Sequence, residues 1–367
     1  MKGIYISNYN LEDTSSGVSK KITMQLNSFN NLGIEMEAPK VYVDSLLSKI
    51  YSRLPMTSTV YDISWGKYLS KKDLQDYDFI YIRHNIITRK TIKNLKCINK
   101  YGVKVFYEIP TYPYDRNENE IKNFFLRKKD KKWRAYLNEY VNYIVDYSGT
   151  DFIYNIPTIQ ISNGIDTNSI ESASSVRGKT IDLIAVALIA DVHGFDRVIK
   201  GLREYYSKDL NDRSVVRFHI VGDGVVRNKL QQSVQDYGLT NFVKFYGLKT
   251  GEELEKIYNS MDIGVGVLGI HRRYRGQKVS SLKTKEYAAK GLPFITAEDD
   301  EAFLQDKFKY DFKVDSNDSP INIEEVVQWY TALLEQESLH DIRKNIRNYA
   351  KKYLSWDLQL IKVVNKL

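Results

Sequence analysis

Short apolar segments alternate with longer amphipathic segments along almost the whole chain, and this pattern constrains the fold more than any other feature. Such alternation is typical of parallel sheets whose faces are covered by helices. In the first half it predicts strands at Gly3–Ser7, Val41–Val43, Asp78–Ile82, Val103–Glu108, Tyr143–Tyr147 and Thr158–Ile161. In the second half it predicts strands at Ile181–Ile189, Arg217–Val221, Val243–Tyr246, Asp262–Val267 and Pro293–Thr296.

The two series of strands indicate two domains. Residues 163–179 between them are polar, rich in Ser and Asn, and have no helical period, which is typical of a linker. We therefore predict an α/β protein with two Rossmann-like domains, residues 1–162 and 180–354, that face a central cleft. We expect a helix over residues 355–367, containing Trp356, to pack on the first domain. Ligands of such folds bind where parallel strands end.

Composition excludes several classes of protein. With 43% hydrophobic and 27% charged residues the chain is not disordered, and its single cysteine, Cys97, excludes an intrachain disulfide and favours a reducing compartment. The N-terminus does not resemble a signal peptide. The longest apolar runs, around Ile184–Ala190 and Ile263–Ile270, are shorter than the roughly 20 residues that span a bilayer. We therefore expect a cytoplasmic protein without a membrane span.

The net charge of +8 favours anionic partners, which include nucleic acid, phosphorylated small molecules and anionic membranes. The basic segment Arg127–Arg134 contains six cations around Trp133. It is interpreted either as a solvated helix face or as a contact with an anionic membrane. Nucleic-acid binding is less favoured, because no nucleic-acid-binding motif accompanies the segment.

Two glycine-bearing loops follow predicted strands. The first, residues 14–19, contains Gly17 and opens a helix, so it is either an ordinary helix cap or a site for an anion or a sugar hydroxyl. The second carries Gly222 and Gly224 at the end of a strand, where glycine allows the backbone to approach a neighbour closely. A bare Gly-x-Gly turn occurs in many α/β proteins and does not specify a ligand by itself.

The most informative segment is Ser280–Ile295, which predicts a helix of small residues followed by Gly-x-Pro and a buried strand. Ser280 or Ser281 can cap this helix, whose free amides would face a phosphate. Glu286 lies a little over one turn into the helix. Its carboxylate is either an ordinary surface group or an acceptor for both hydroxyls of a ribose.

These elements, in this order, resemble the bacterial retaining glycosyltransferases with the GT-B fold. The resemblance covers nearly the whole chain and is strongest over residues 163–295. It is closer still to a branch that makes capsular polysaccharides and exopolysaccharides, through the segments His193–Arg197, Gly269–Phe294 and Glu108–Asp115. The implied activity is transfer of a hexosyl group from a nucleotide sugar, a UDP-sugar by resemblance, to a sugar hydroxyl of a lipid-linked glycan. The anomeric configuration would be retained.

The resemblance also assigns roles. Glu286 would hold the nucleotide ribose, Gly222 and Gly224 would border the base, and Gly17 would lie near the donor phosphates and the acceptor. His193 occupies the position of a lysine that clamps the donor diphosphate, and the clamp arginine corresponds to Leu188. The first glutamate of the family's paired-glutamate element corresponds to Lys278. The missing cations could be replaced by a basic group comprising Arg272, Arg273, Arg275, Lys278 and Lys283, because guanidinium groups bind phosphate oxygens in pairs.

On the acceptor side, two groups of residues follow predicted strands. Arg83 and His84 follow one strand, and the segment from Glu108 through Thr111 and Tyr112 follows the next. Glu108 could orient an acceptor hydroxyl or take its proton, and Tyr112 or Tyr114 could stack on a sugar ring. The expected catalytic residues are Glu108, His193 and Arg273, and the expected donor site includes Ser281 and Lys283.

Other chemistry finds little support in the sequence. The five histidines and one cysteine show no metal-ligand spacing, and neither a nucleophile elbow nor a P-loop occurs. The acidic run Glu298–Glu301 favours a helix cap over a metal site. The resemblance implies no metal and no cofactor besides the nucleotide-sugar substrate. Two alternatives remain: a non-catalytic subunit of the same fold that binds a partner glycosyltransferase or a glycan, and a nucleotide-sugar epimerase.

Overall fold

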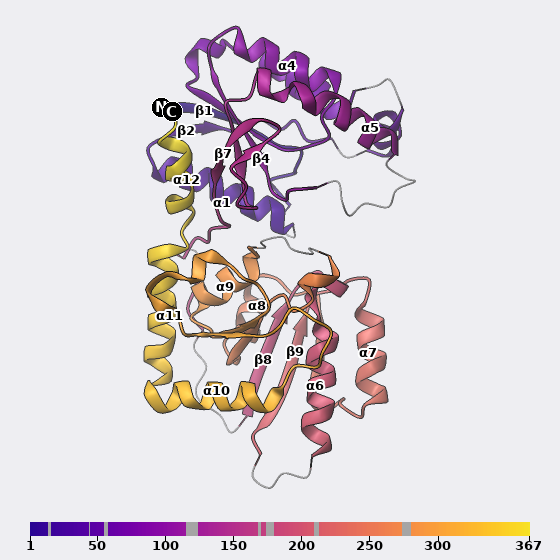
Figure 1. Ribbon diagram of the computed structural model, residues 1–367, viewed down its shortest axis with the longest axis vertical. Coiled ribbons are helices and arrows are strands. Elements are labelled where there is room, and N and C mark those ends of the chain that lie inside the picture. Colours follow the sequence, from indigo (N-terminus) through magenta and orange to yellow (C-terminus); the bar gives the residue numbers. More distant parts are fainter. Residues whose placement is uncertain are drawn as a thin grey trace. The chain divides into compact units, whose positions relative to one another are not determined.

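The computed structural model describes residues 1–13, 16–43, 45–54, 58–114, 124–167, 170–173, 180–208, 213–273 and 280–367. The chain divides into two compact units (Figure 1). Unit 1 comprises Met1–Ser162 and Trp356–Leu367, and unit 2 comprises Asn163–Ser355. Each unit is built around its own sheet.

Unit 1 has, within the described ranges, a seven-stranded sheet in the order β2-β1-β3-β4-β5-β7-β6. Its strands are β1 (Lys2–Ile6), β2 (Glu35–Glu37), β3 (Phe79–Arg83), β4 (Lys104–Ile109), β5 (Tyr143–Asp146), β6 (Phe152–Ile153) and β7 (Ile156–Gln160). Neighbouring strands are parallel except for the β6–β7 pair. The helices are α1 (Gly17–Asn31), α2 (Leu46–Arg53), α3 (Val60–Leu69), α4 (Arg89–Asn99), α5 (Phe124–Trp133) and α12 (Trp356–Val364).

The strands of unit 1 are apolar on both faces because helices cover both. Alternate residues of a strand point to opposite sides of its sheet, so Tyr81 packs with α1 and α12 on one face while Ile80 and Ile82 pack with α3 and α4 on the other. Two of these helices begin at threonines whose side chains accept backbone N–H groups, Thr59 before α3 and Thr88 before α4.

Unit 2 has, in its described part, a six-stranded parallel sheet in the order β10-β9-β8-β11-β12-β13. Its strands are β8 (Thr180–Val186), β9 (Val215–Val221), β10 (Val243–Gly247), β11 (Ile263–Val265), β12 (Phe294–Thr296) and β13 (Asp311–Lys313). The helices are α6 (Phe195–Ser207), α7 (Arg227–Asp236), α8 (Gly251–Tyr258), α9 (Leu282–Lys290), α10 (Ile323–Gln336) and α11 (Leu339–Tyr353).

The structure corrects some of the predicted strands. Residues 41–43 do not form a strand; the second strand of unit 1 is β2, which begins soon after α1 ends at a turn containing Gly33. β2 lies at the sheet edge and carries two glutamates in three residues, so it does not form an apolar run in the sequence. β13 was missed for a similar reason: it is a short edge strand that carries Asp311 and Lys313.

Candidate functional site

The glycine turn after β9 lies directly against the segment that follows β8. Gly222 and Gly224 have φ angles of 122° and 159°, and a Cβ on Gly222 would lie 1.9 Å from the carbonyl oxygen of Ala187. The N–H of Ile189 donates to the carbonyl of Asp223 at 2.7 Å, which joins the two segments. The glycines are therefore required by a close approach of two backbones at the carboxyl end of the sheet.

Exposed apolar side chains surround this turn. Leu188 follows β8, Val225 follows β9 and Leu248 follows β10, and these are three neighbouring strands of the sheet. Leu188 is 80% exposed and Val225 is 92% exposed. A flat apolar ring could cover such side chains, so this edge has the character of a surface for a nucleobase.

Helix α9 of unit 2 carries the residues that were predicted to bind the ribose and the phosphates of the donor. Ser281 is its N-cap residue, but the Ser281 hydroxyl donates to Glu298 Oε2 at 2.7 Å instead of capping the helix. Glu286 lies one turn into α9, is half-buried, and accepts a hydrogen bond from the buried hydroxyl of Tyr258 at 3.3 Å. The N-terminal end of α9 therefore keeps its positive dipole end available to an anion.

His193 and Lys283 form a close pair beside the start of α9. Nε2 of His193 lies 3.1 Å from Nζ of Lys283, and Nδ1 of His193 accepts the N–H of Ala190 at 3.1 Å. Burial and the charges of Lys283 and Arg273 lower the pKa of His193 to about 3, and burial also lowers the pKa of Lys283. An anion placed beside this pair would favour the protonated form of both groups.

Arg272 does not fit its expected role in donor binding. Its guanidinium makes a paired contact with Asp196 at 2.7 and 2.9 Å, contacts Asp318 at 2.6 and 2.8 Å, and donates to the carbonyl of Asp191. All five N–H groups of the side chain are used by these contacts, so Arg272 anchors the loop to the start of α6. Arg273 is exposed and close enough to His193 to lower its pKa. Arg275 and Lys278 lie outside the described residues.

Glu108 is also placed differently from the expectation. It is fully buried at the end of β4, where Oε1 accepts hydrogen bonds from Arg83 at 2.5 Å and from the Tyr147 hydroxyl at 2.9 Å. Oε2 accepts one from the Tyr5 hydroxyl at 3.1 Å, and Nζ of Lys21 lies 3.4 Å from Oε1. Although burial opposes ionisation, the two cations lower the pKa of Glu108 to about 2. A carboxylate so held is poorly suited to take a proton from an acceptor, and Arg83 is part of the same buried network.

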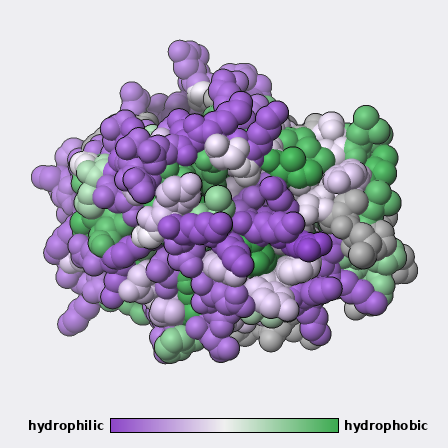
Figure 2. All heavy atoms as spheres, turned by 90° about the horizontal axis from the view of Figure 1, so that it is seen from above, coloured by the Kyte–Doolittle hydropathy of each residue, from purple (hydrophilic) through white to green (hydrophobic). Residues whose placement is uncertain are grey.

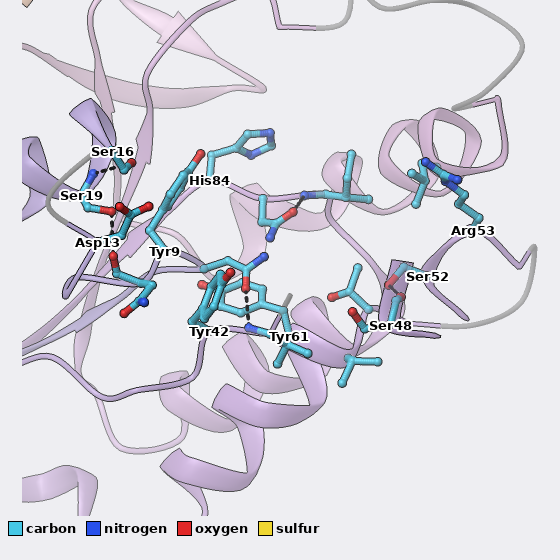
Figure 3. A pocket seen from close by; sticks show the side chains of 18 residues that line it. Tyr9, Asp13, Ser16, Ser19, Tyr42, Ser48, Ser52, Arg53, Tyr61 and His84 are labelled. Atoms are coloured by element: carbon cyan, nitrogen blue, oxygen red, sulfur yellow. Dashed lines mark hydrogen bonds between the residues drawn. The ribbon is translucent and has the colours of Figure 1, made fainter. Parts of the chain in front are cut away.

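A cavity of about 610 Å³ opens in unit 1 where β1 and β3 end (Figure 3). Figure 3 shows Tyr9, Tyr42 and Tyr61 toward the middle of the cavity, with Ser16 and Ser19 at the start of α1 at one end and Ser48 and Ser52 of α2 at the other. Aromatic faces interleaved with hydroxyl and amide groups are the lining that suits a sugar.

Of the predicted acceptor residues, only His84 lines this cavity. Its ring packs on Tyr114 with centroids 4.1 Å apart, and burial with the charges of Arg83 and Arg134 lowers its pKa to about 3. Thr111 is exposed, and the ring of Tyr112 packs edge-on against Tyr154.

Gly17 begins α1, and open space surrounds the position of its missing side chain. The capping alternative holds for its neighbour Ser16, which accepts the N–H of Ser19 at 3.2 Å. Thr14 and Ser15, from the same predicted loop, lie outside the described residues.

Sequence reasoning missed the cavity tyrosines and Glu298. Tyr9 and Tyr42 follow short strands or lie in loops, and only their clustering in three dimensions distinguishes them from the other tyrosines of the chain. Glu298 belongs to the acidic run that was expected to cap a helix, and Asp300 of that run does accept the N–H of Ala302. In the part of the chain that the structure describes, no three His, Cys, Asp or Glu side chains gather as metal ligands.

Comparisons with known proteins show which fold the whole chain has and which family model part of unit 2 matches. A family model described as "Glycosyl transferases group 1" matches residues 181–330. A glycosyltransferase from Rickettsia africae superposes with a TM-score of 0.66 at 13% identity, covering 100% of this chain and 97% of that chain. HepE from Anabaena, crystallised with UDP, gives 0.60 at 12% identity, with 100% and 99% covered.

A third solved structure, the lipopolysaccharide outer core galactosyltransferase WaaB, gives a TM-score of 0.55 at 13% identity, with 100% of both chains covered. A search of curated protein sequences found no match. The predicted fold class is confirmed, since both parallel-sheet units align with these proteins along their whole length. Residues 181–330 match the glycosyl transferases group 1 model, and the whole chain has the two-domain GT-B fold of these glycosyltransferases.

Proposed function

We propose that this protein is a glycosyltransferase that moves a hexosyl group from a UDP-sugar to a sugar hydroxyl of a lipid-linked glycan, with retention of configuration, in bacterial capsule or exopolysaccharide synthesis. The observation that carries the donor half of the proposal is the arrangement at α9. Within little more than one turn, this helix presents its positive end, Lys283 and Glu286. His193 joins this group through its contact with Lys283. A diphosphate with its ribose needs cationic and carboxylate groups in that order.

The chemistry would place negative charge on the departing UDP. The bond between the anomeric carbon and the phosphate oxygen breaks, a bond to the acceptor oxygen forms, and the acceptor proton passes to an oxygen of the donor phosphate. Lys283, Arg273 and the start of α9 would stabilise the leaving diphosphate. This route needs no protein base, and it is compatible with Glu108 being locked in its buried network.

A UDP donor is supported by HepE, which binds UDP and shares the fold. A glycan acceptor is supported by the tyrosine-lined cavity of unit 1. WaaB, which also shares the fold, is a lipopolysaccharide outer core galactosyltransferase. The basic segment Arg127–Arg134 supports contact with an anionic membrane, where a lipid-linked acceptor would be found.

The first test is calorimetric titration of the protein with UDP, GDP and ADP. We expect UDP to bind, and Glu286→Ala to weaken its binding by about tenfold or more, the effect of losing a carboxylate that accepts two hydroxyls. The matched control is Glu252→Ala, which removes an exposed carboxylate from the neighbouring helix α8. Unchanged affinity in Glu286→Ala would refute the ribose role.

The second candidate function is a non-catalytic subunit, favoured by Leu188 at the clamp-arginine position and by the full engagement of Arg272 in ion pairs. It predicts that no nucleotide binds. A nucleotide-sugar epimerase would instead bind UDP and convert its UDP-sugar when no acceptor is present. Incubation of UDP-sugars with the protein alone therefore separates the epimerase from the transferase, and the UDP titration separates the non-catalytic subunit from both.

A further inference from the structure

Helix α2 presents an unusually apolar face to solvent. Leu46 is 74% exposed, Leu47 is 78% exposed and Ile50 is 51% exposed, and Tyr51 and Leu54 are exposed as well. These residues occupy one side of a helix of only eight residues. Single exposed leucines are common on protein surfaces, but a contiguous group of five large apolar residues usually marks an interaction site.

Helix α5 extends this face and adds positive charge. Phe124 and Phe125 are each about half exposed, and Nζ of Lys128 lies 4.5 Å from the centre of the Phe124 ring. Lys128, Lys131 and Lys132 are exposed at helical spacings of three and four from the phenylalanines and from each other, so they share a side of the helix. Apolar and cationic side chains are therefore interleaved on α5.

The two helices form one surface because α5 is tied to α2. Nζ of the buried Lys129 donates to the carbonyl oxygen of Ser52 at 2.5 Å. We define the α2–α5 surface as the exposed apolar residues Leu46, Leu47, Ile50, Tyr51, Leu54, Phe124 and Phe125 with the exposed cations Arg53, Lys128, Lys131 and Lys132. Figure 2 shows hydrophobic side chains gathered at one side of unit 1, the side on which α5 lies in Figure 1.

We propose that the α2–α5 surface inserts into the headgroup region of an anionic lipid bilayer. The exposed apolar side chains and the cations interleaved with them match the two layers of such an interface, since the apolar groups enter the acyl boundary while the cations meet lipid phosphates. No helix within the described ranges is long and apolar enough to cross a membrane. The contact is therefore interfacial.

The opposite side of α2 lines the cavity of unit 1. Ser48 and Ser52 face the 610 Å³ cavity (Figure 3), and Leu126 of α5 lines it too. The cavity thus begins at the helices that meet the bilayer and continues to the N-terminus of α1. This inference rests on the proposed lipid-linked acceptor: the sugars that extend from the lipid would enter the cavity from its α2 end.

The test is flotation of the purified full chain with phosphatidylcholine vesicles, with and without about 30% phosphatidylglycerol, in the absence of any nucleotide. We expect binding to the anionic vesicles that weakens at high salt. Leu46→Gln/Leu47→Gln and Lys128→Gln/Lys132→Gln should each weaken binding about tenfold. The matched controls are Leu304→Gln, an exposed leucine of unit 2, and Lys93→Gln/Lys96→Gln, two exposed lysines on α4 of unit 1.

Several results would overturn the proposal. These are no binding to either vesicle, equal binding to both, or equal loss in the control variants. Loss of a dimer in the leucine variant, seen by size-exclusion chromatography, would assign the surface to a second copy of the chain instead. UDP titration of the same variants keeps the two ideas separate: vesicle binding without UDP binding refutes the donor assignment alone, and the reverse refutes the membrane surface alone.

Discussion

Replacement of Glu298 by Gln should change how the stability of unit 2 depends on pH. Glu298 is 1% exposed, its Oε2 accepts the Ser281 hydroxyl, and its Oε1 has no hydrogen-bond partner among the described residues. Burial raises the pKa of the Glu298 carboxyl from 4.5 to about 7, although Lys285 opposes this. Lys283 and Asp300 are the other charged groups that act on it.

The sign follows from proton binding. Between about pH 4.5 and pH 7 the folded protein keeps the Glu298 proton and the unfolded chain has lost it, so raising the pH favours unfolding. A difference of about 2.5 pKa units, at about 1.4 kcal/mol each, amounts to about 3 kcal/mol that the parent loses across this window. Glutamine does not titrate, so Glu298→Gln should not suffer this loss.

The assay is thermal unfolding of parent and variant at pH 5 and at pH 8. The melting temperature of the variant relative to the parent should rise by roughly 6–12 °C between the two values, since 1 kcal/mol corresponds to about 2–4 °C for a unit of this size. The buried amide of glutamine adds a cost that is the same at both pH values, and the comparison removes it. A temperature difference that is independent of pH would refute the reasoning.

Two further predictions concern the other buried charges. Glu108→Gln should destabilise the protein by about 3–5 kcal/mol in urea unfolding, because Arg83 and Lys21 would stay buried without their carboxylate; a folded, equally stable variant that had lost only activity would contradict the structural role. Binding of UDP should take up protons, because a diphosphate beside His193 and Lys283 would raise the pKa of both groups. Titration calorimetry in two buffers of different ionisation enthalpy measures this uptake, and identical binding heats in both buffers would exclude it.

Most of the fold was predictable because buried parallel strands are apolar runs that end at turns. β3, β4 and β8 are buried along most of their length, and the sequence located each of them to within one to three residues. The edge strands β2 and β13 were not found, because their charged residues leave no apolar signal.

The site was predictable only in part, because residue type does not reveal which contacts a side chain makes. The sequence identified Glu286 and Lys283 as members of one helix, and a helix is a local element. It could not show that Asp196 and Asp318, far apart in sequence, together with the carbonyl of Asp191 occupy the donors of Arg272. The tyrosine cavity likewise is lined by side chains from six separate segments, and a local sequence pattern does not predict such a cluster.

The return of α12 to unit 1 has a consequence for the order in which the protein forms during synthesis. Trp356, Leu360 and Val363 complete the core that contains Tyr5 and Ile22, yet they leave the ribosome only after the whole of unit 2. During synthesis, part of the core of unit 1 therefore stays exposed until α12 has been made. Unit 2 needs no later segment and can fold before that point. We expect chaperones to bind the exposed core of unit 1 during this interval. Deletion of Trp356–Leu367 should leave that core permanently exposed.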